Sequence, residues 1–223
     1  MLIPAFSLAY APAACNRIAP PVARGDHDMI GRFFRRGGGD PAIPAALYGA
    51  IVAQARNPVL FSDIGIADTV DGRFESVVLH CVLLLRRFGR GDEEMRSTGQ
   101  AVFDLFCTEM DRSLREMGVG DLAVPKRMRK IGEVFYGRSA AFDSALANED
   151  ADALAASLER NIPAAEGRQL AVAALASYML ASDAALASAS KRELMKGEAP
   201  FADPAAFLQD GKDEGKQAAG EGD

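Results

Sequence analysis

The sequence predicts an all-α protein: a single compact helical domain of about six helices, with a flexible N-terminal leader and a disordered acidic C-terminal tail. Apolar side chains recur at the i, i+3, i+4 spacing of a helix through the middle of the chain. Glycine, proline and capping aspartate residues separate these stretches. With 223 residues, of which 49% are hydrophobic and 25% charged, the chain can bury a globular core.

Residues 1–39 form the predicted leader. The opening stretch "MLIPAFSLAYAPAAC" lacks a basic segment and is broken by Pro4 and Pro12, so it fits a secretory signal poorly. Met29 offers an alternative start, because "MIGRFFRR" opens a short basic and aromatic segment. The glycines at 37–39 then form a hinge into the helical domain, which we place at residues 40–190.

Each helix of the domain has its own boundary signals. Asp40 and Pro41 begin the first helix, and Pro58 ends it. Residues 58–71 lack helical periodicity and are expected to form an irregular connection. The remaining helices are predicted at 72–89, 92–118, 125–148, 150–163 and 166–190. In the 92–118 helix the apolar stripe extends to Met117.

The last helix and the residues after it bear on the membrane question. The apolar run "LAVAALASYMLA" is twelve residues long, and a membrane span needs about 20. We therefore expect a core helix and no transmembrane segment. Residues 191–223 contain five basic and eight acidic side chains, which predicts the disordered acidic tail.

Composition and motifs argue against an enzyme. The net charge is −6 and the pI is about 5.1, which disfavours a dedicated nucleic-acid binder. Only two histidines are present, and the three cysteines form no CxxC pair. The chain has no HExxH, GxSxG or phosphate-binding-loop motif. We predict no catalytic residues, no cofactor and no metal site.

Residues 118–130, "GVGDLAVPKRMRK", are the unusual feature of this acidic chain. Gly118 and Gly120 are expected to end one helix, Asp121 to cap the turn, and Pro125 to begin the next helix. The first turn or so of that helix carries four cations: Lys126, Arg127, Arg129 and Lys130.

Cations are unfavourable at a helix N-terminus, where the helix dipole is positive. The pattern therefore indicates a docking site for something anionic: lipid headgroups, RNA phosphate or an acidic partner segment. Arg112 and Arg115, one helix earlier, are predicted to widen the patch. A solvated surface is the alternative interpretation, because Arg112 and Arg115 also have carboxylates four residues away on the same helix.

Two stretches are distinctive enough to show a family resemblance. "FSDIGIADTVDGRFE" and "MDRSLREMGVGDLAVPKRMRK", within about residues 47–190, closely resemble the ubiquinol–cytochrome c chaperone family. The resemblance implies a non-enzymatic, all-helical assembly factor for the quinol-oxidising, cytochrome c-reducing complex. It implies binding of newly made cytochrome b or another subunit, and for the mitochondrial relative a small partner protein near the ribosomal exit.

From the resemblance and the missing span we expect a cytoplasmic protein at the periphery of the inner membrane, without DNA as a partner. Two other functions stay open. One is a small helical enzyme or phosphate-metabolite binder that uses Arg115, Lys126 and Arg129, and the other is a ribosome- or RNA-binding module. The sequence also leaves open whether residues 58–73 form a client groove or only pack the core.

Overall fold

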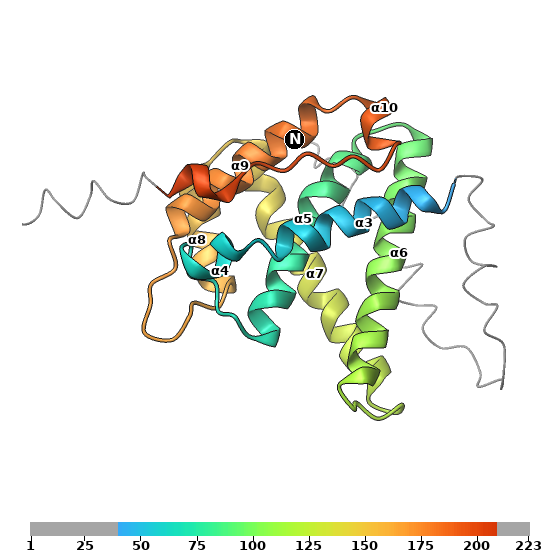
Figure 1. Cartoon of the computed structure of the whole chain (residues 1–223), viewed down its shortest axis with the longest axis horizontal. Coiled ribbons are helices and arrows are strands. Elements are labelled where there is room, and N and C mark those ends of the chain that lie inside the picture. The colour runs from blue at the N-terminus through green and yellow to red at the C-terminus, as the bar shows by residue number, and fades with distance from the viewer. Residues whose placement is uncertain (1–39, 209–223) are drawn as a thin grey trace, which may run out of the picture.

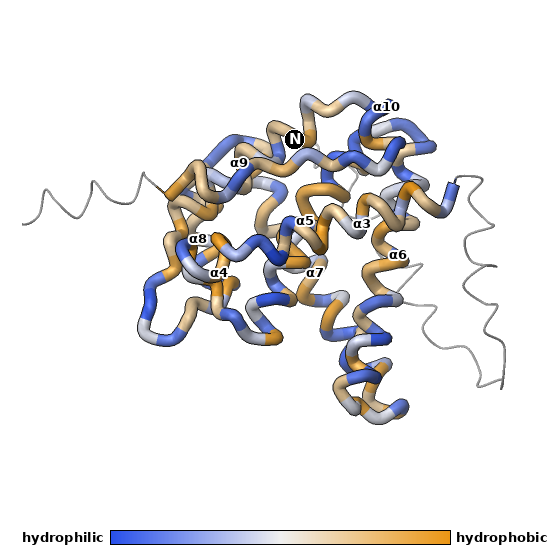
Figure 2. The backbone as a smooth tube through the Cα atoms, viewed as in Figure 1, coloured by the Kyte–Doolittle hydropathy of each residue, from blue (hydrophilic) through white to orange (hydrophobic). Residues whose placement is uncertain are grey.

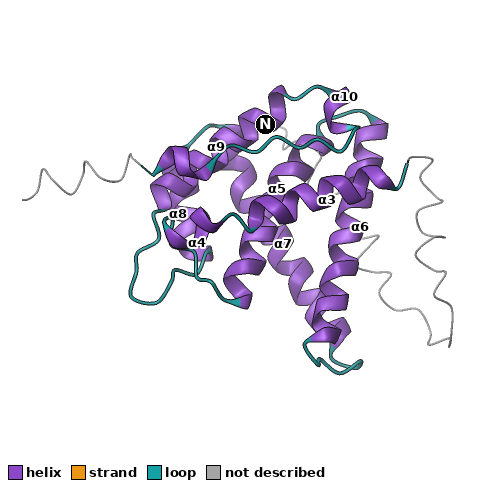
Figure 3. Cartoon of the chain, in the orientation of Figure 1, coloured by secondary structure: helices purple, strands orange, loops and turns teal. Residues whose placement is uncertain are grey.

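The computed structural model describes residues 40–208, in which helices joined by loops are present without a β-strand (Figures 1 and 3). The all-α prediction is confirmed. The predicted leader, with the alternative start at Met29, and residues 209–223 lie outside the described residues. The elements are α3 (Ala42–Ala55), α4 (Pro58–Ser62), α5 (Val70–Gly89), α6 (Glu93–Glu116), α7 (Val124–Ala147), α8 (Ala151–Asn161), α9 (Val172–Ser188), α10 (Lys191–Leu194) and the 3₁₀ helix η3 (Pro204–Phe207).

Helix α5 is the centre of the molecule (Figure 1). It packs against α3, α6, α7 and α9, and most of its residues are buried. Its sequence is apolar almost all round between Val78 and Leu85, as expected for a helix enclosed by others. The other helices are therefore arranged by their contact with α5.

Polar side chains on α5 are buried too, and each has a partner on a neighbouring helix. Arg86, only 4% exposed, lies between two carboxylates, at 2.8 Å from Asp143 of α7 and 2.5 Å from Asp183 of α9. Glu75 forms a bidentate ion pair with Arg138 of α7, at 2.8 and 3.0 Å. Because a buried charge is costly without a partner, these contacts fix α7 and α9 against α5.

A second buried network surrounds His80 of α5. Its Nδ1 lies 2.7 Å from the carbonyl oxygen of Ser76, which can only accept, so Nδ1 carries the proton. Burial lowers the pKa of His80 to about 4, so the ring is neutral at pH 7. Nε2 then accepts from the Tyr178 hydroxyl at 2.6 Å, and that hydroxyl accepts from Gln54 at 3.1 Å. The network joins α3, α5 and α9 through a neutral histidine.

Residues 58–71 are more ordered than the irregular connection predicted for them. Asn57 caps the short helix α4 by accepting from the Val59 amide. Leu60, Ile64 and Ile66 are fully buried, so the inner side of this segment packs the core. Its outer side, including Phe61, lines a shallow hollow of about 470 Å³.

Helix α5 begins at Val70, two residues before the predicted start at Gly72. The side chain of Thr69 caps it by accepting from the Gly72 amide at 3.1 Å. A Cβ at Gly72 would lie 1.9 Å from the backbone oxygen of Ala67, so only glycine allows this close approach.

The final long helix starts later than predicted, at Val172 instead of residue 166. The chain before it is held in a non-helical path by backbone hydrogen bonds to residues 64–67: Ala67 to Pro163, Ala165 to Gly65, and Ala171 to Ile64. These bonds satisfy backbone groups that a longer helix would have used internally.

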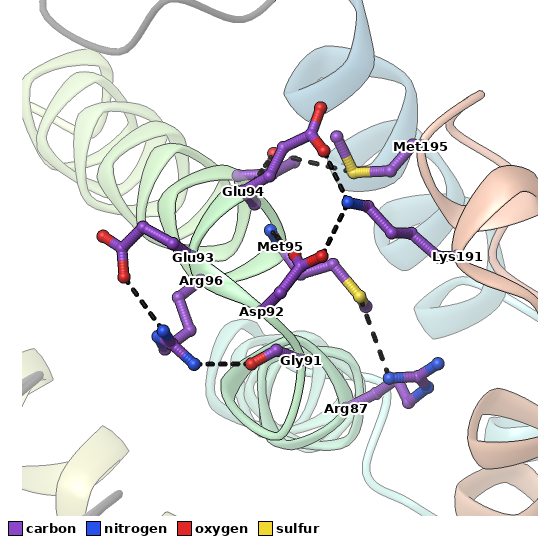
Figure 4. Close-up of polar contacts among 10 residues, drawn as sticks. Arg87, Gly91, Asp92, Glu93, Glu94, Met95, Arg96, Lys191 and Met195 are labelled. Atoms are coloured by element: carbon purple, nitrogen blue, oxygen red, sulfur yellow. Dashed lines mark hydrogen bonds and ion pairs between the residues drawn. The ribbon is translucent and has the colours of Figure 1, made fainter.

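The disordered tail predicted from residue 191 is wrong for residues 191–208. The side chains of Ser190 and Glu193 form a capping box at the start of α10. Lys191 reaches back to the N-terminus of α6, at 2.7 Å from Asp92 and 2.5 Å from Glu94 (Figure 4). The segment is polar in composition but contains a few well-spaced apolar residues, of which Leu194 is fully buried.

We predict that Gly72→Ala lowers the free energy of unfolding by about 1–3 kcal/mol, because the new methyl group overlaps the Ala67 carbonyl. Gly137→Ala is the matched control: it lies in open space within α7, and alanine there raises helix stability by about 0.5–1 kcal/mol. Urea unfolding measures both. A Gly72→Ala variant with the same free energy of unfolding as the wild type would contradict the close approach of Gly72 to Ala67.

We also predict that stability falls as pH drops from 6.5 to 4. Burial lowers the pKa of His80 from 6.5 to about 4, so the unfolded chain takes up a proton first as pH falls. The free energy of unfolding falls by on the order of 3 kcal/mol between pH 6.5 and pH 4. Above pH 6.5, His80 contributes no pH dependence. Urea unfolding at several pH values gives the free energy of unfolding as a function of pH. Between pH 6.5 and pH 4, this free energy should fall more steeply for the wild type than for His80→Gln. Equal slopes would exclude His80 as the cause.

Candidate functional site

The basic run lies at the tip of an antiparallel hairpin formed by α6 and α7, at the lower edge of Figure 1. Helix α6 ends in a Schellman motif: the Val119 amide bonds the Leu114 carbonyl, and the Gly118 amide bonds the Arg115 carbonyl. Gly118 has φ +82°, the left-handed conformation that this motif requires. The predicted role of Gly118 in ending the helix is consistent with this geometry.

The other residues predicted to form the turn behave differently. Gly120 does not have a positive φ, and its carbonyl accepts from the amides of Ala123 and Val124. The side chain of Asp121, predicted to cap the turn, is 88% exposed and pairs with Arg115 at 2.5 Å. Ala123 occupies the N-cap position without a side-chain hydrogen bond, and Pro125 is the second residue of the helix. A tight backbone turn thus replaces the predicted aspartate cap.

Aromatic packing fixes the base of the hairpin. Phe103 and Phe106 of α6 contact Phe135 of α7, with ring centroids 4.9 and 5.8 Å apart. Beyond Phe106, no residue of α6 is buried. The last ten residues of α6 therefore extend about 15 Å past the aromatic contact, at 1.5 Å per residue.

All four cations in the first two turns of α7 are exposed at this tip, and none of them forms an ion pair with another described residue. The first turn of α7 contains no acidic side chain. Val124 and Met128, on the opposite side of the helix, are 1% and 2% exposed. The packing thus turns Lys126, Arg127, Arg129 and Lys130 outward together.

Arg112 and Arg115 lie on the neighbouring helix but are already paired. Arg112 contacts Glu109 at 2.8 Å and Glu116 at 3.6 Å, and Arg115 contacts both Asp111 and Asp121. Hydrogen bonds to Asp111 raise the pKa of Arg115 above its usual value. The two arginines are therefore paired with four carboxylates and add no unpaired positive charge. We use "basic patch" below for Lys126, Arg127, Arg129 and Lys130 alone.

The turn also exposes two apolar side chains, which the sequence reasoning missed. Leu122 is 100% exposed, and Met117, predicted on the apolar stripe of α6, is 55% exposed. Figure 2 shows hydrophobic and hydrophilic residues alternating along this part of the backbone. Because Gly118 ends α6 directly after Met117, the chain turns before that side chain can reach the core.

The other chemical features of the described residues lie elsewhere. No group of three or more His, Cys, Asp and Glu side chains between residues 40 and 208 is placed to hold a metal. Two surface hollows, of about 520 and 470 Å³, are lined by residues around Glu193 and around Arg56. Neither includes Arg115, Lys126 or Arg129, which the metabolite-binding alternative requires. No helix within residues 40–208 is both long and apolar enough to cross a membrane.

Comparison with known proteins decides the family. The profile described as "Ubiquinol-cytochrome C chaperone" matches residues 62–201, more than half of the chain. This chain belongs to the ubiquinol–cytochrome c chaperone family. The predicted resemblance is confirmed, and the match extends past residue 190 into the segment predicted as tail.

A solved structure supports the family and the fold. The crystal structure of the Cbp3 homolog from Brucella abortus is 35% identical to this chain, with a TM-score of 0.69. The similarity covers 79% of this chain and 98% of that one. No curated protein matches the chain. The hairpin tip lies within the residues that match the family.

We predict that changing all four patch residues to glutamine leaves stability unchanged or raises it by up to about 1 kcal/mol. These cations have no ion pair within the described residues and oppose the dipole of α7, while glutamine has a similar helix propensity. Thermal unfolding by circular dichroism is the measurement.

Arg86→Gln is the contrasting variant, because it leaves Asp143 and Asp183 without their buried cation. It should lose about 3–5 kcal/mol. A quadruple variant that unfolds as readily as Arg86→Gln would show that the basic patch is structural.

Proposed function

We propose that this chaperone-family member is a non-enzymatic assembly factor for the ubiquinol–cytochrome c reductase complex. It binds newly made cytochrome b, or another subunit, through a helical surface that includes the basic patch. The observation that carries the proposal is the family membership, supported by similarity to almost the whole of a Cbp3 homolog. No described feature favours the enzyme or metabolite-binding alternative.

The proposed site of action is the cytoplasmic face of the inner membrane. A client such as cytochrome b is membrane-embedded, so the chaperone must work beside the bilayer. The basic patch supports this location, since exposed cations are attracted to anionic surfaces. We propose that the protein is bound there peripherally, and that high salt releases it.

The test is deletion of the gene in the source organism. The assembled reductase and its haem b should fall, while transcripts of the reductase subunits stay unchanged. Wild-type complementation should restore the complex, and the quadruple glutamine variant should restore less of it. A normal level of assembled complex in the deletion strain would refute the assembly role.

A charge-matched variant distinguishes the effect of the basic patch from the effect of the total net charge. Four cations that are exposed outside the hairpin and form no ion pair within the described residues are replaced with glutamine instead: Arg160, Arg168, Arg192 and Lys196. This variant changes the net charge by the same amount and should complement fully. Equal defects in both variants would show that total charge, and not the patch, supports assembly.

A further inference from the structure

The tip of the α6–α7 hairpin combines two kinds of exposed side chain that are rarely left free together. Three large apolar residues of the described chain are strongly exposed, and two of them, Leu122 and Met117, lie in this one turn. Single exposed apolar residues need no explanation. Here the fully exposed Leu122 precedes the first cation of the basic patch by only four residues.

The four cations share one side of α7. At 100° per residue, Lys126, Arg127, Arg129 and Lys130 fall within an arc of about 160°. The centre of this arc is opposite the buried residues Val124 and Met128. Long Lys and Arg side chains can therefore extend from this side in one direction, past the turn that carries Leu122.

Acidic groups near the tip cancel the patch only in part. Arg115 pairs with Asp111 and Asp121, and Arg112 pairs with Glu109 and Glu116, so the two arginines offset two of these four carboxylates. With the four cations of the basic patch, these side chains carry a net charge of +2. The cations among them without an ion pair to a described residue all lie on α7.

The chemistry of the tip fits a lipid surface better than RNA. Single-stranded nucleic acid is bound by aromatic side chains that stack on bases, and residues 117–130 contain no aromatic residue. Aliphatic side chains beside cations are typical of proteins that bind the membrane interface, where apolar groups enter below the headgroups.

We propose that the α6–α7 tip docks on anionic phospholipid. Lys126, Arg127, Arg129 and Lys130 bind the phosphate-bearing headgroups, and Leu122, with Met117 beside it, inserts at the boundary with the acyl chains. The hairpin extends beyond its aromatic base, so the tip reaches the bilayer while the body of the domain stays clear for a client. This proposal rests on the docking role of the basic patch proposed above and is independent of the identity of the client.

A tryptophan at the tip tests the insertion directly. The full chain contains no tryptophan, so Leu122→Trp introduces a single reporter at a fully exposed position. Its emission should shift to the blue on addition of vesicles of phosphatidylcholine with phosphatidylglycerol, and brominated lipids should quench it. Vesicles of phosphatidylcholine alone should leave it unchanged.

The control reporter is Ala187→Trp, at an exposed position near the end of α9, on the upper side of Figure 1. It should show no shift, even if another segment of the chain also binds vesicles. In the Leu122→Trp background, glutamine at the four patch positions should weaken vesicle binding by about 100-fold or more. Leu122→Ser in the wild-type chain should weaken it by about 10-fold in co-sedimentation.

An unshifted emission from the Leu122→Trp variant with anionic vesicles would overturn the proposal, as would equal shifts in the Leu122→Trp and Ala187→Trp variants. Loss of ribosome binding in the quadruple variant, with the tip reporter silent on vesicles, would assign the patch to RNA instead. The assembly role is judged separately by the deletion strain. If the deletion strain lacks assembled reductase and the Leu122→Trp emission does not change with vesicles, the assembly role stands and lipid docking at the tip is refuted.

Discussion

The burial of α5 between Glu75 and Phe88 is the constraint on which the rest of the structure depends. A helix enclosed by others can contain polar side chains only if each finds a partner nearby. Ser76 donates to Ala55 of α3, His80 bonds Tyr178 of α9, and Arg86 bridges α7 and α9. The requirement to satisfy these groups fixes which helices surround α5 and in what register. A purely apolar α5 would bury as much surface and specify its neighbours less well.

The C-terminal segment completes this arrangement. Gln54 donates to the Ala202 carbonyl at 2.9 Å, and Ser182 accepts from the Ala202 amide at 3.2 Å. Phe201 contacts the edge of His80, with ring centroids 5.3 Å apart. At the other end, Arg87 donates to the carbonyls of Leu186 and Ala189, close to the Lys191 ion pairs shown in Figure 4. Residues 191–208 thus cover the buried polar network and belong to the folded domain.

The molecule divides its roles between this closed body and the projecting hairpin. The body holds the buried ion pairs and the neutral histidine, which are groups that stabilise one structure. The hairpin tip holds unpaired cations and exposed apolar side chains, which contribute little to folding. Surfaces that bind other molecules commonly show this pattern, because their side chains find partners only in the complex. In the proposed assembly role, the tip provides contact with the surroundings while the body keeps its shape.

The sequence by itself determined the helical class, most helix boundaries, the family and the position of the basic run. Helical periodicity and capping residues such as Asp92 and Asp150 are local signals, confirmed by the caps of α6 and α8. Only the tertiary structure decided features that depend on contacts distant in the chain. Residues 163–171 are non-helical because they bond to residues 64–67, Lys191 is ordered because it meets Asp92, and Asp121 pairs with Arg115 instead of capping the turn. Leu122 is likewise exposed because the hairpin tip lies away from the core, and the local sequence pattern does not predict that position.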